Sequence, residues 1–61
     1  MNLTATTCDA NGNEINLNGE SVEELAKALA EHEDPSLRAR VYDEPGWIRG
    51  WIHGDGSWRA Q

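Results

Sequence analysis

The residues best suited to bind another molecule lie in the second half of the chain, where all four arginines and all three tryptophans occur. Guanidinium groups stack on aromatic rings and donate paired hydrogen bonds to carboxylates and phosphates. Tryptophan, tyrosine and arginine are also the residue types that dominate binding hot spots. We therefore expect one partner-binding surface, made by Arg38, Arg40, Tyr42, Trp47, Arg49 and Trp51.

Three kinds of partner fit this composition. A protein partner is our leading expectation, because even a small chain covers a standard interface of ~800 Å² per partner. Single-stranded nucleic acid is an alternative, in which bases stack on the aromatic rings and arginines contact phosphates. In a third alternative the acidic N-terminal half imitates nucleic acid and occupies a basic protein. The arginines and rings also have a purely structural interpretation, in which arginine stems shield aromatic rings on an exposed sheet.

A calcium loop is one further chemistry that the sequence suggests, in the stretch DANGNEINLNGE. The oxygen-bearing side chains at positions 1, 3, 5 and 12 of that pattern are Asp9, Asn11, Asn13 and Glu20. However, Glu14 occupies the position that requires glycine, and a strand is expected before the loop instead of a helix. A hairpin turn is therefore the better interpretation.

The sequence contains no recognisable arrangement of nucleophile, base and third catalytic group. Cys8 is the single cysteine, which leaves it no partner for a disulfide or a thiolate metal site. His32 and His53 fall in different predicted elements. A chain of 61 residues is also too small to enclose the usual active-site pocket of several hundred Å³, roughly 300–1,000. We expect a non-enzymatic protein with no catalytic residue, metal or cofactor.

The charge of the chain is unevenly distributed around a formal net value of -6. Residues 1–36 carry eight acids and one lysine, whereas residues 37–61 carry four arginines and three acids. Overall acidity disfavours unselective binding to nucleic acid or anionic membranes, although a local arginine cluster still acts within about 10 Å at moderate salt. The sequence shows no secretory leader or apolar span, so we expect a cytoplasmic protein, monomeric or weakly dimeric, that does not bind membranes.

The chain is predicted to begin with a β-hairpin. Ala5 and Thr7 alternate with polar residues, as in a half-buried strand. A two-residue Asn-Gly loop would turn the apolar residues to the wrong face, so we expect a three-residue loop with Gly12 in the left-handed region. This loop pairs Thr7 with Ile15 and Ala5 with Leu17.

A helix is predicted to follow the hairpin and to end at Pro35. Ser21 is a good N-cap, and Glu24 completes a capping box. The apolar residues that recur at helical spacing are Val22, Leu25, Ala26 and Leu29. This stripe predicts one buried face.

Three short strands are predicted after the helix, separated by DEPG and HGDG. A four-residue loop, Asp43–Gly46, is expected at the first turn, because a two-residue type I or II turn matches strand twist poorly. With this loop Ile48 and Ile52 face the core. Trp47, Arg49, Trp51 and His53 then join the preceding arginines on the open face, flanked by Thr4, Thr6 and Asn16.

The second turn determines where Trp58 lies. A three-residue loop, Gly54–Gly56, carries Trp58 to the core side, whereas a two-residue loop carries it to the arginine side. We expect the longer loop, because a chain without phenylalanine gains up to ~3 kcal/mol from burying a large aromatic ring. The same loop places Arg59 with the other arginines.

The predicted fold is a single α+β domain over residues 1–61, in the order β-β-α-β-β with a possible fifth strand. One helix packs on one face of a mainly antiparallel sheet, an arrangement that resembles a β-grasp layout. The predicted core is Leu3, Ile15, Leu17, Val22, Leu25, Leu29, Leu37, Val41, Ile48 and Ile52. Because such a layout carries no function by itself, we base the expected role, a small acidic adaptor or inhibitor, on the arginine and tryptophan surface.

Overall fold

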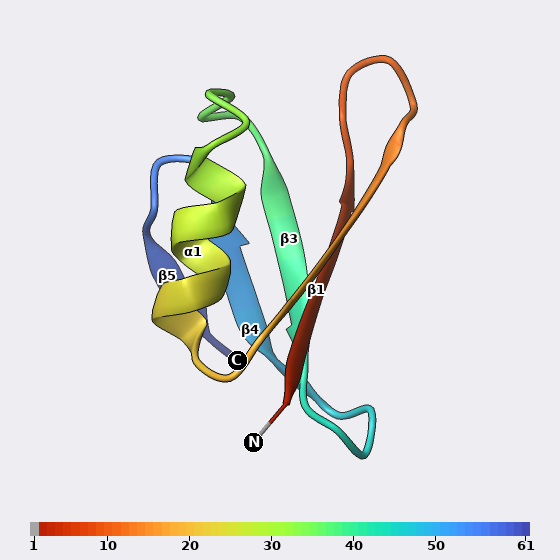
Figure 1. Cartoon of the computed structure of the whole chain (residues 1–61), viewed down its shortest axis with the longest axis vertical. Coiled ribbons are helices and arrows are strands. Elements are labelled where there is room, and N and C mark those ends of the chain that lie inside the picture. Colours follow the sequence, from red (N-terminus) through yellow and green to blue (C-terminus); the bar gives the residue numbers. More distant parts are fainter. Residues whose placement is uncertain (1) are drawn as a thin grey trace.

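The computed structural model describes residues 2–61, which form a five-stranded sheet with a single helix against one face (Figure 1). The elements are β1 (Leu3–Cys8), β2 (Glu14–Gly19), α1 (Val22–Ala30), β3 (Arg38–Tyr42), β4 (Ile48–His53) and β5 (Trp58–Ala60). The strand order is β2-β1-β3-β4-β5, and every pair of neighbours is antiparallel. The predicted α+β architecture is confirmed, and the possible fifth strand is present.

The first hairpin has the predicted register and loop. Thr7 pairs with Ile15, and Ala5 pairs with Leu17. Gly12 has a φ of 83°, in the left-handed region that favours glycine. The apolar face therefore selected the correct loop length from the sequence.

The helix begins as predicted but ends earlier. The Ser21 hydroxyl accepts a hydrogen bond from the Glu24 N–H at 3.3 Å, whereas the Glu24 carboxylate accepts one from the Glu20 N–H at 2.7 Å. The last helical residue is Ala30, so the prediction that Pro35 ends the helix is wrong. The three N–H groups that follow donate to carbonyl oxygens three residues back, which tightens the chain and ends the helix.

The core lies between α1 and the sheet and consists mainly of predicted residues. The buried residues are Leu3, Ala5, Leu25, Ala26, Leu29, Leu37, Ala39, Val41 and Ile52. The predicted residues Ile15, Leu17 and Val22 pack against this cluster but stay partly exposed. A chain of this length buries only about 60% of the surface that its unfolded form exposes, so each of these side chains matters to stability.

The loop between β3 and β4 is shorter than the predicted four residues. The Asp43 N–H donates to the Trp47 carbonyl oxygen at 3.0 Å, and the Gly46 N–H donates to the Asp43 carbonyl oxygen at 2.9 Å. The Asp43 carboxylate also accepts a hydrogen bond from the Trp47 N–H at 2.9 Å. Asp43 and Trp47 therefore close a three-residue loop, and the predicted Asp43–Gly46 loop is wrong.

A β-bulge next to this loop changes which residues of β4 face the core. Tyr42 pairs with Ile48, but Val41 pairs with Gly50, so Ile48 and Arg49 together oppose Tyr42. Ile48 is half-buried and lies outside the core cluster, so the prediction that it faces the core is wrong. Beyond the bulge the predicted alternation of faces holds.

The last turn has the predicted size. The His53 N–H donates to the Ser57 carbonyl oxygen at 2.9 Å, which closes a three-residue loop, and Trp58 pairs with Ile52 as predicted. The Trp58 ring lies over Gly50, because a Cβ added to that glycine would be 2.7 Å from Trp58 Cη2. Trp58 is 38% exposed and lies outside the core cluster, so the expectation that its ring is buried in the core is wrong although the loop length is right.

Candidate functional site

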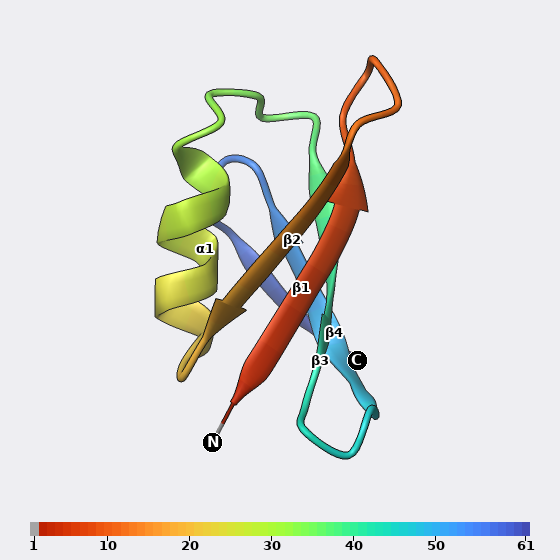
Figure 2. The same ribbon diagram turned by 45° about the vertical axis from the view of Figure 1, so that its right-hand side comes forward.

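One row of paired residues crosses all five strands on the face opposite α1. The row consists of Asn16, Thr6, Arg40, Trp51 and Arg59, in which each residue is the cross-strand partner of the next. Neighbours in a strand point to opposite faces, and Ala5, Val41 and Ile52 beside these residues are buried in the core. We call this set the central row. It lies on the side of the sheet that the helix leaves open (Figure 2).

The side chains around the central row contact one another. The Arg38 guanidinium carbon lies 5.6 Å from the centroid of the Trp51 ring, within the range of a cation–π interaction. Arg38 pairs with His53 across β3 and β4, two residues along each strand from the pair of Arg40 and Trp51. The Arg40 Nη1 donates to the Tyr42 hydroxyl oxygen at 3.3 Å. These contacts hold the long arginine side chains in defined positions.

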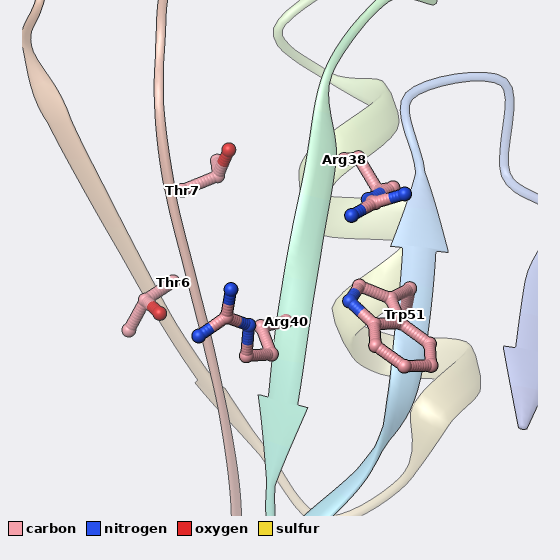
Figure 3. A pocket seen from close by; sticks show the side chains of 5 residues that line it. All are labelled: Thr6, Thr7, Arg38, Arg40 and Trp51. Atoms are coloured by element: carbon pink, nitrogen blue, oxygen red, sulfur yellow. The ribbon is translucent and has the colours of Figure 1, made fainter. Parts of the chain in front are cut away.

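Two shallow pockets adjoin on this face, because both are lined by Arg38 and Trp51. The first has a volume of about 320 Å³ and is completed by Thr6, Thr7 and Arg40 (Figure 3). The second, of about 250 Å³, is completed by His53 and Arg59. Together their lining residues come from β1, β3, β4 and β5.

The charge in these pockets is positive and uncompensated. Neither pocket is lined by an acidic residue of the described chain. Within residues 2–61, one ion pair has a nitrogen–oxygen distance of 4.0 Å or less. It joins Arg49 Nη1 and Asp43 Oδ2 at 3.7 Å. Arg38, Arg40 and Arg59 therefore have no carboxylate within 4.0 Å among the described residues, although the whole chain carries eleven acids.

The structure gathers four of the six predicted site residues and separates the other two. Arg38, Arg40 and Trp51 line the first pocket, with Tyr42 hydrogen-bonded to Arg40 at its edge. Trp47 precedes β4, is 72% exposed and lines neither pocket. Arg49 is the extra residue of the bulge, and its guanidinium is paired with Asp43. The loop and bulge that the sequence did not predict account for this separation.

Four residues outside the predicted set also line the pockets: Thr6, Thr7, His53 and Arg59. Strand alternation already placed Thr6, His53 and Arg59 on this face. Thr7 was expected on the core side, yet it reaches the pocket because β1 pairs with β3 only as far as Thr6. No signal in the sequence marks the point where the two strands separate.

Three of the four residues of the calcium pattern, Asp9, Asn11 and Asn13, serve the hairpin turn. The Asp9 carboxylate accepts hydrogen bonds from the N–H groups of Asn11 and Asn13, each at 2.9 Å, and the Asn13 bond contributes most to lowering the pKa of Asp9. The backbone N–H of Ser57 likewise lowers the pKa of Asp55 in the last turn. Across residues 2–61, no three His, Cys, Asp or Glu side chains gather closely enough to hold a metal ion.

Comparison with known proteins adds no further constraint. Neither a protein-family model, a curated protein nor a solved structure matches the chain. In the described part of the chain, no helix has the length and apolar character needed to cross a membrane.

Proposed function

We propose that this chain is a small, cytoplasmic, non-enzymatic protein that docks a protein partner through its open sheet face, as an adaptor or inhibitor does. The observation that carries the proposal is the central row, in which Arg40 and Arg59 flank Trp51 with no acid beside them. Tryptophan and arginine are enriched at the energetic centres of interfaces. Arginines without an internal carboxylate remain available to acidic groups of a partner.

The dimensions of the open face fit such an interface. The part of the central row from Thr6 to Arg59 crosses four strands, which at about 4.8 Å between neighbours is about 14 Å. A standard interface covers about 800 Å² of each partner. The chain exposes 4199 Å², so a standard interface would cover about a fifth of its surface.

The arrangement of the aromatic rings supports a protein partner over single-stranded nucleic acid. Sequence-tolerant binding of single strands uses successive bases stacked on exposed rings. Here Trp51 is half-buried with Arg38 over its ring, the Tyr42 hydroxyl is bonded to Arg40, and Trp47 lies outside the pockets. A net charge of -6 also opposes the approach of a polyanion.

Affinity capture with matched variants tests the proposal. The immobilised chain is exposed to nuclease-treated lysate of its source organism, and recovered proteins are quantified for the wild type and for Arg40→Gln, Arg59→Gln and Arg49→Gln variants. Each variant removes one positive charge, but Arg49 lies outside both pockets and is paired with Asp43. We expect the first two variants to reduce recovery of a specific protein at least about tenfold, the equivalent of ~1.4 kcal/mol, with little change for the third.

Three outcomes would contradict the proposal. Equal loss with all three arginine variants would indicate nonspecific charge attraction. Loss confined to Glu23→Gln and Glu31→Gln variants would indicate that the acidic surface is the contact, as in nucleic-acid mimicry. Recovery of a partner only before nuclease treatment would indicate a nucleic acid. Circular dichroism and urea unfolding of each variant check that the fold persists.

A further inference from the structure

The first pocket combines hydrogen-bond donors from three strands at one place. Figure 3 shows the guanidinium group of Arg40 extending from β3 toward β1, and that of Arg38 lying beside Trp51. Thr7 projects from β1 toward β3, and the Trp51 ring carries its nitrogen on the side of the pocket. Guanidinium and indole nitrogens donate hydrogen bonds and accept none, whereas threonine hydroxyls do both. The Arg40 guanidinium and Thr7 lie between β1 and β3, whereas the Arg38 guanidinium and the Trp51 ring lie on the β4 side of β3, so the pocket offers donors to an acceptor on both sides of β3.

The geometry of the sheet keeps this pocket open. β1 pairs with β3 at Thr4, Ala5 and Thr6, and no pairing follows although β1 continues to Cys8. The end of the first hairpin consequently projects away from β3, as the separation of β1 and β3 toward the hairpin loop shows (Figure 1). The pocket lies where β1 and β3 separate. β1 lines one side of it, and β3 and β4 line the other.

The charge of the pocket favours a ligand with negative charge. Arg38 and Arg40 contribute two positive charges, and neither has a carboxylate within 4.0 Å among the described residues. A guanidinium group fits the oxygens of a carboxylate or a phosphoryl group, and such charge-assisted hydrogen bonds are roughly twice as strong as neutral ones.

We infer that the pocket lined by Thr6, Thr7, Arg38, Arg40 and Trp51 binds an oxyanion carried by a side chain of the partner protein, a phosphoryl or carboxylate group. The identity of the carrier rests on the proposed function. A phosphoryl group carries about -1.5 to -2 charges at pH 7 and three acceptor oxygens, so its charge matches the formal charge of the two arginines. The pocket consequently binds a phosphate monoester more tightly than a single carboxylate.

Titrations of the isolated chain test the pocket without any partner. Phenyl phosphate and acetate are added separately at constant ionic strength, and amide and indole N–H chemical shifts are followed by NMR. We expect saturable shifts at Thr6, Thr7 and the Trp51 indole, with phenyl phosphate binding more tightly than acetate. The Arg40→Gln variant is expected to bind phenyl phosphate about tenfold or more weakly, the loss typical of a hydrogen bond to a charged group. Arg49→Gln serves as the control of equal charge and is expected to bind like the wild type.

Binding experiments with peptides and an oligonucleotide identify the kind of molecule that carries the oxyanion. A phosphoserine peptide, a glutamate peptide and an oligothymidylate of equal charge are compared with the wild type and the two variants. Tighter binding of either peptide than of the oligonucleotide, weakened by Arg40→Gln, supports the inference. Tighter binding of the oligonucleotide would overturn the assignment to a protein partner.

Failure of the pocket is distinguishable from failure of the proposed function. The inferred oxyanion site would be overturned by the absence of chemical-shift changes with phenyl phosphate and acetate, or by equal weakening of phenyl phosphate binding in Arg40→Gln and Arg49→Gln. Either result would do so even if protein capture still required Arg40. Conversely, a pocket that binds phenyl phosphate and the acidic peptides while capture is indifferent to Arg40 and Arg59 would overturn the proposed docking face.

Discussion

Gly54 is the point where the last turn of the sheet touches the chain leaving the helix, and a Gly54→Ala variant is expected to lose stability. A methyl group added there would lie 2.9 Å from the Asp34 carbonyl carbon and 3.0 Å from Pro35 Cα, and closer still to the Asp34 oxygen. Carbon atoms prefer separations of about 3.5–4.0 Å, and the oxygen contact is tighter than either carbon contact, so the backbone must move by roughly 1 Å or more. The Gly54 N–H donates to the Leu37 carbonyl oxygen at 2.8 Å, and the Leu37 N–H donates to the Asp34 carbonyl oxygen at 3.2 Å. That movement therefore strains at least one of these bonds.

The expected loss is about 2–4 kcal/mol, because overpacking costs about 1–3 kcal/mol and a lost hydrogen bond about 1 kcal/mol. This is a large share of the total for 61 residues, about 3–9 kcal/mol at roughly 0.05–0.15 kcal/mol per residue. Urea unfolding followed by circular dichroism measures the change at constant m-value.

Gly56 supplies the matched control in the same turn. It has a φ of 92°, and nothing lies within 4 Å of an added Cβ, so Gly56→Ala introduces backbone strain of about 1–2 kcal/mol without a clash. Asparagine tolerates the left-handed region, so Gly56→Asn is expected to recover part of that loss. A Gly54→Ala variant as stable as the wild type, or more stable than Gly56→Ala, would refute the steric reasoning.

Three further predictions concern the helix, the core and the first turn. Ser21→Ala removes the N-cap hydroxyl and is expected to lower the free energy of unfolding, measured in urea, by about 1 kcal/mol. An unchanged free energy of unfolding would contradict the capping role of Ser21. Leu29→Ala removes a fully buried side chain and is expected to cost about 2–5 kcal/mol, which a thermal melt would register as a large fall in Tm. Asp9→Asn is expected to destabilise the chain at pH 7. The pKa of Asp9 in the folded chain lies below its ordinary value of 3.8. The stability that the Asp9 carboxylate contributes is therefore fully present above pH 3.8 and is lost as the pH falls through the lower folded pKa. Urea unfolding from pH 7 to pH 2 should show the gap between Asp9→Asn and wild type closing, and a gap independent of pH would contradict the role of the carboxylate.

The sequence predicted the elements whose residues carry a local signal. Glycine at position 12 and the alternation around Ala5 fixed the register of the first hairpin, because a shift of one residue would have exposed the apolar face. The spacing of Leu25 and Leu29 predicted the buried side of the helix, and both are fully buried. In these segments local propensity and the burial of apolar side chains favour the same secondary structure and the same register.

The β3–β4 register could not be obtained from alternation alone, because a bulge breaks alternation. The Asp43 side chain accepts the Trp47 N–H and closes a shorter loop, and the extra residue Arg49 then restores the pattern at Trp51. An isolated glycine inside a strand pattern is a known sign of a bulge, and Gly50 stood next to this one. Trp51 was therefore placed correctly even though Trp47 and Ile48 were not.

The separation of charge between layers explains how an acidic chain presents a cationic site. Most of its acids precede residue 37, and exposed ones such as Glu23 and Glu31 lie on the helix or directly after it, whereas the central row lies on the far face of the sheet. Glu14 is an exception, because its carboxylate accepts a hydrogen bond from Asn16 at 3.2 Å, at the β2 end of that row. Packed layers are about 10 Å apart, which is close to the Debye length at 0.1 M salt. At that salt the helix acids are largely screened at the open face, while Arg38, Arg40 and Arg59 act on a bound group directly. The local charge of the pocket, and not the net charge of the chain, therefore determines which ligand the open face binds.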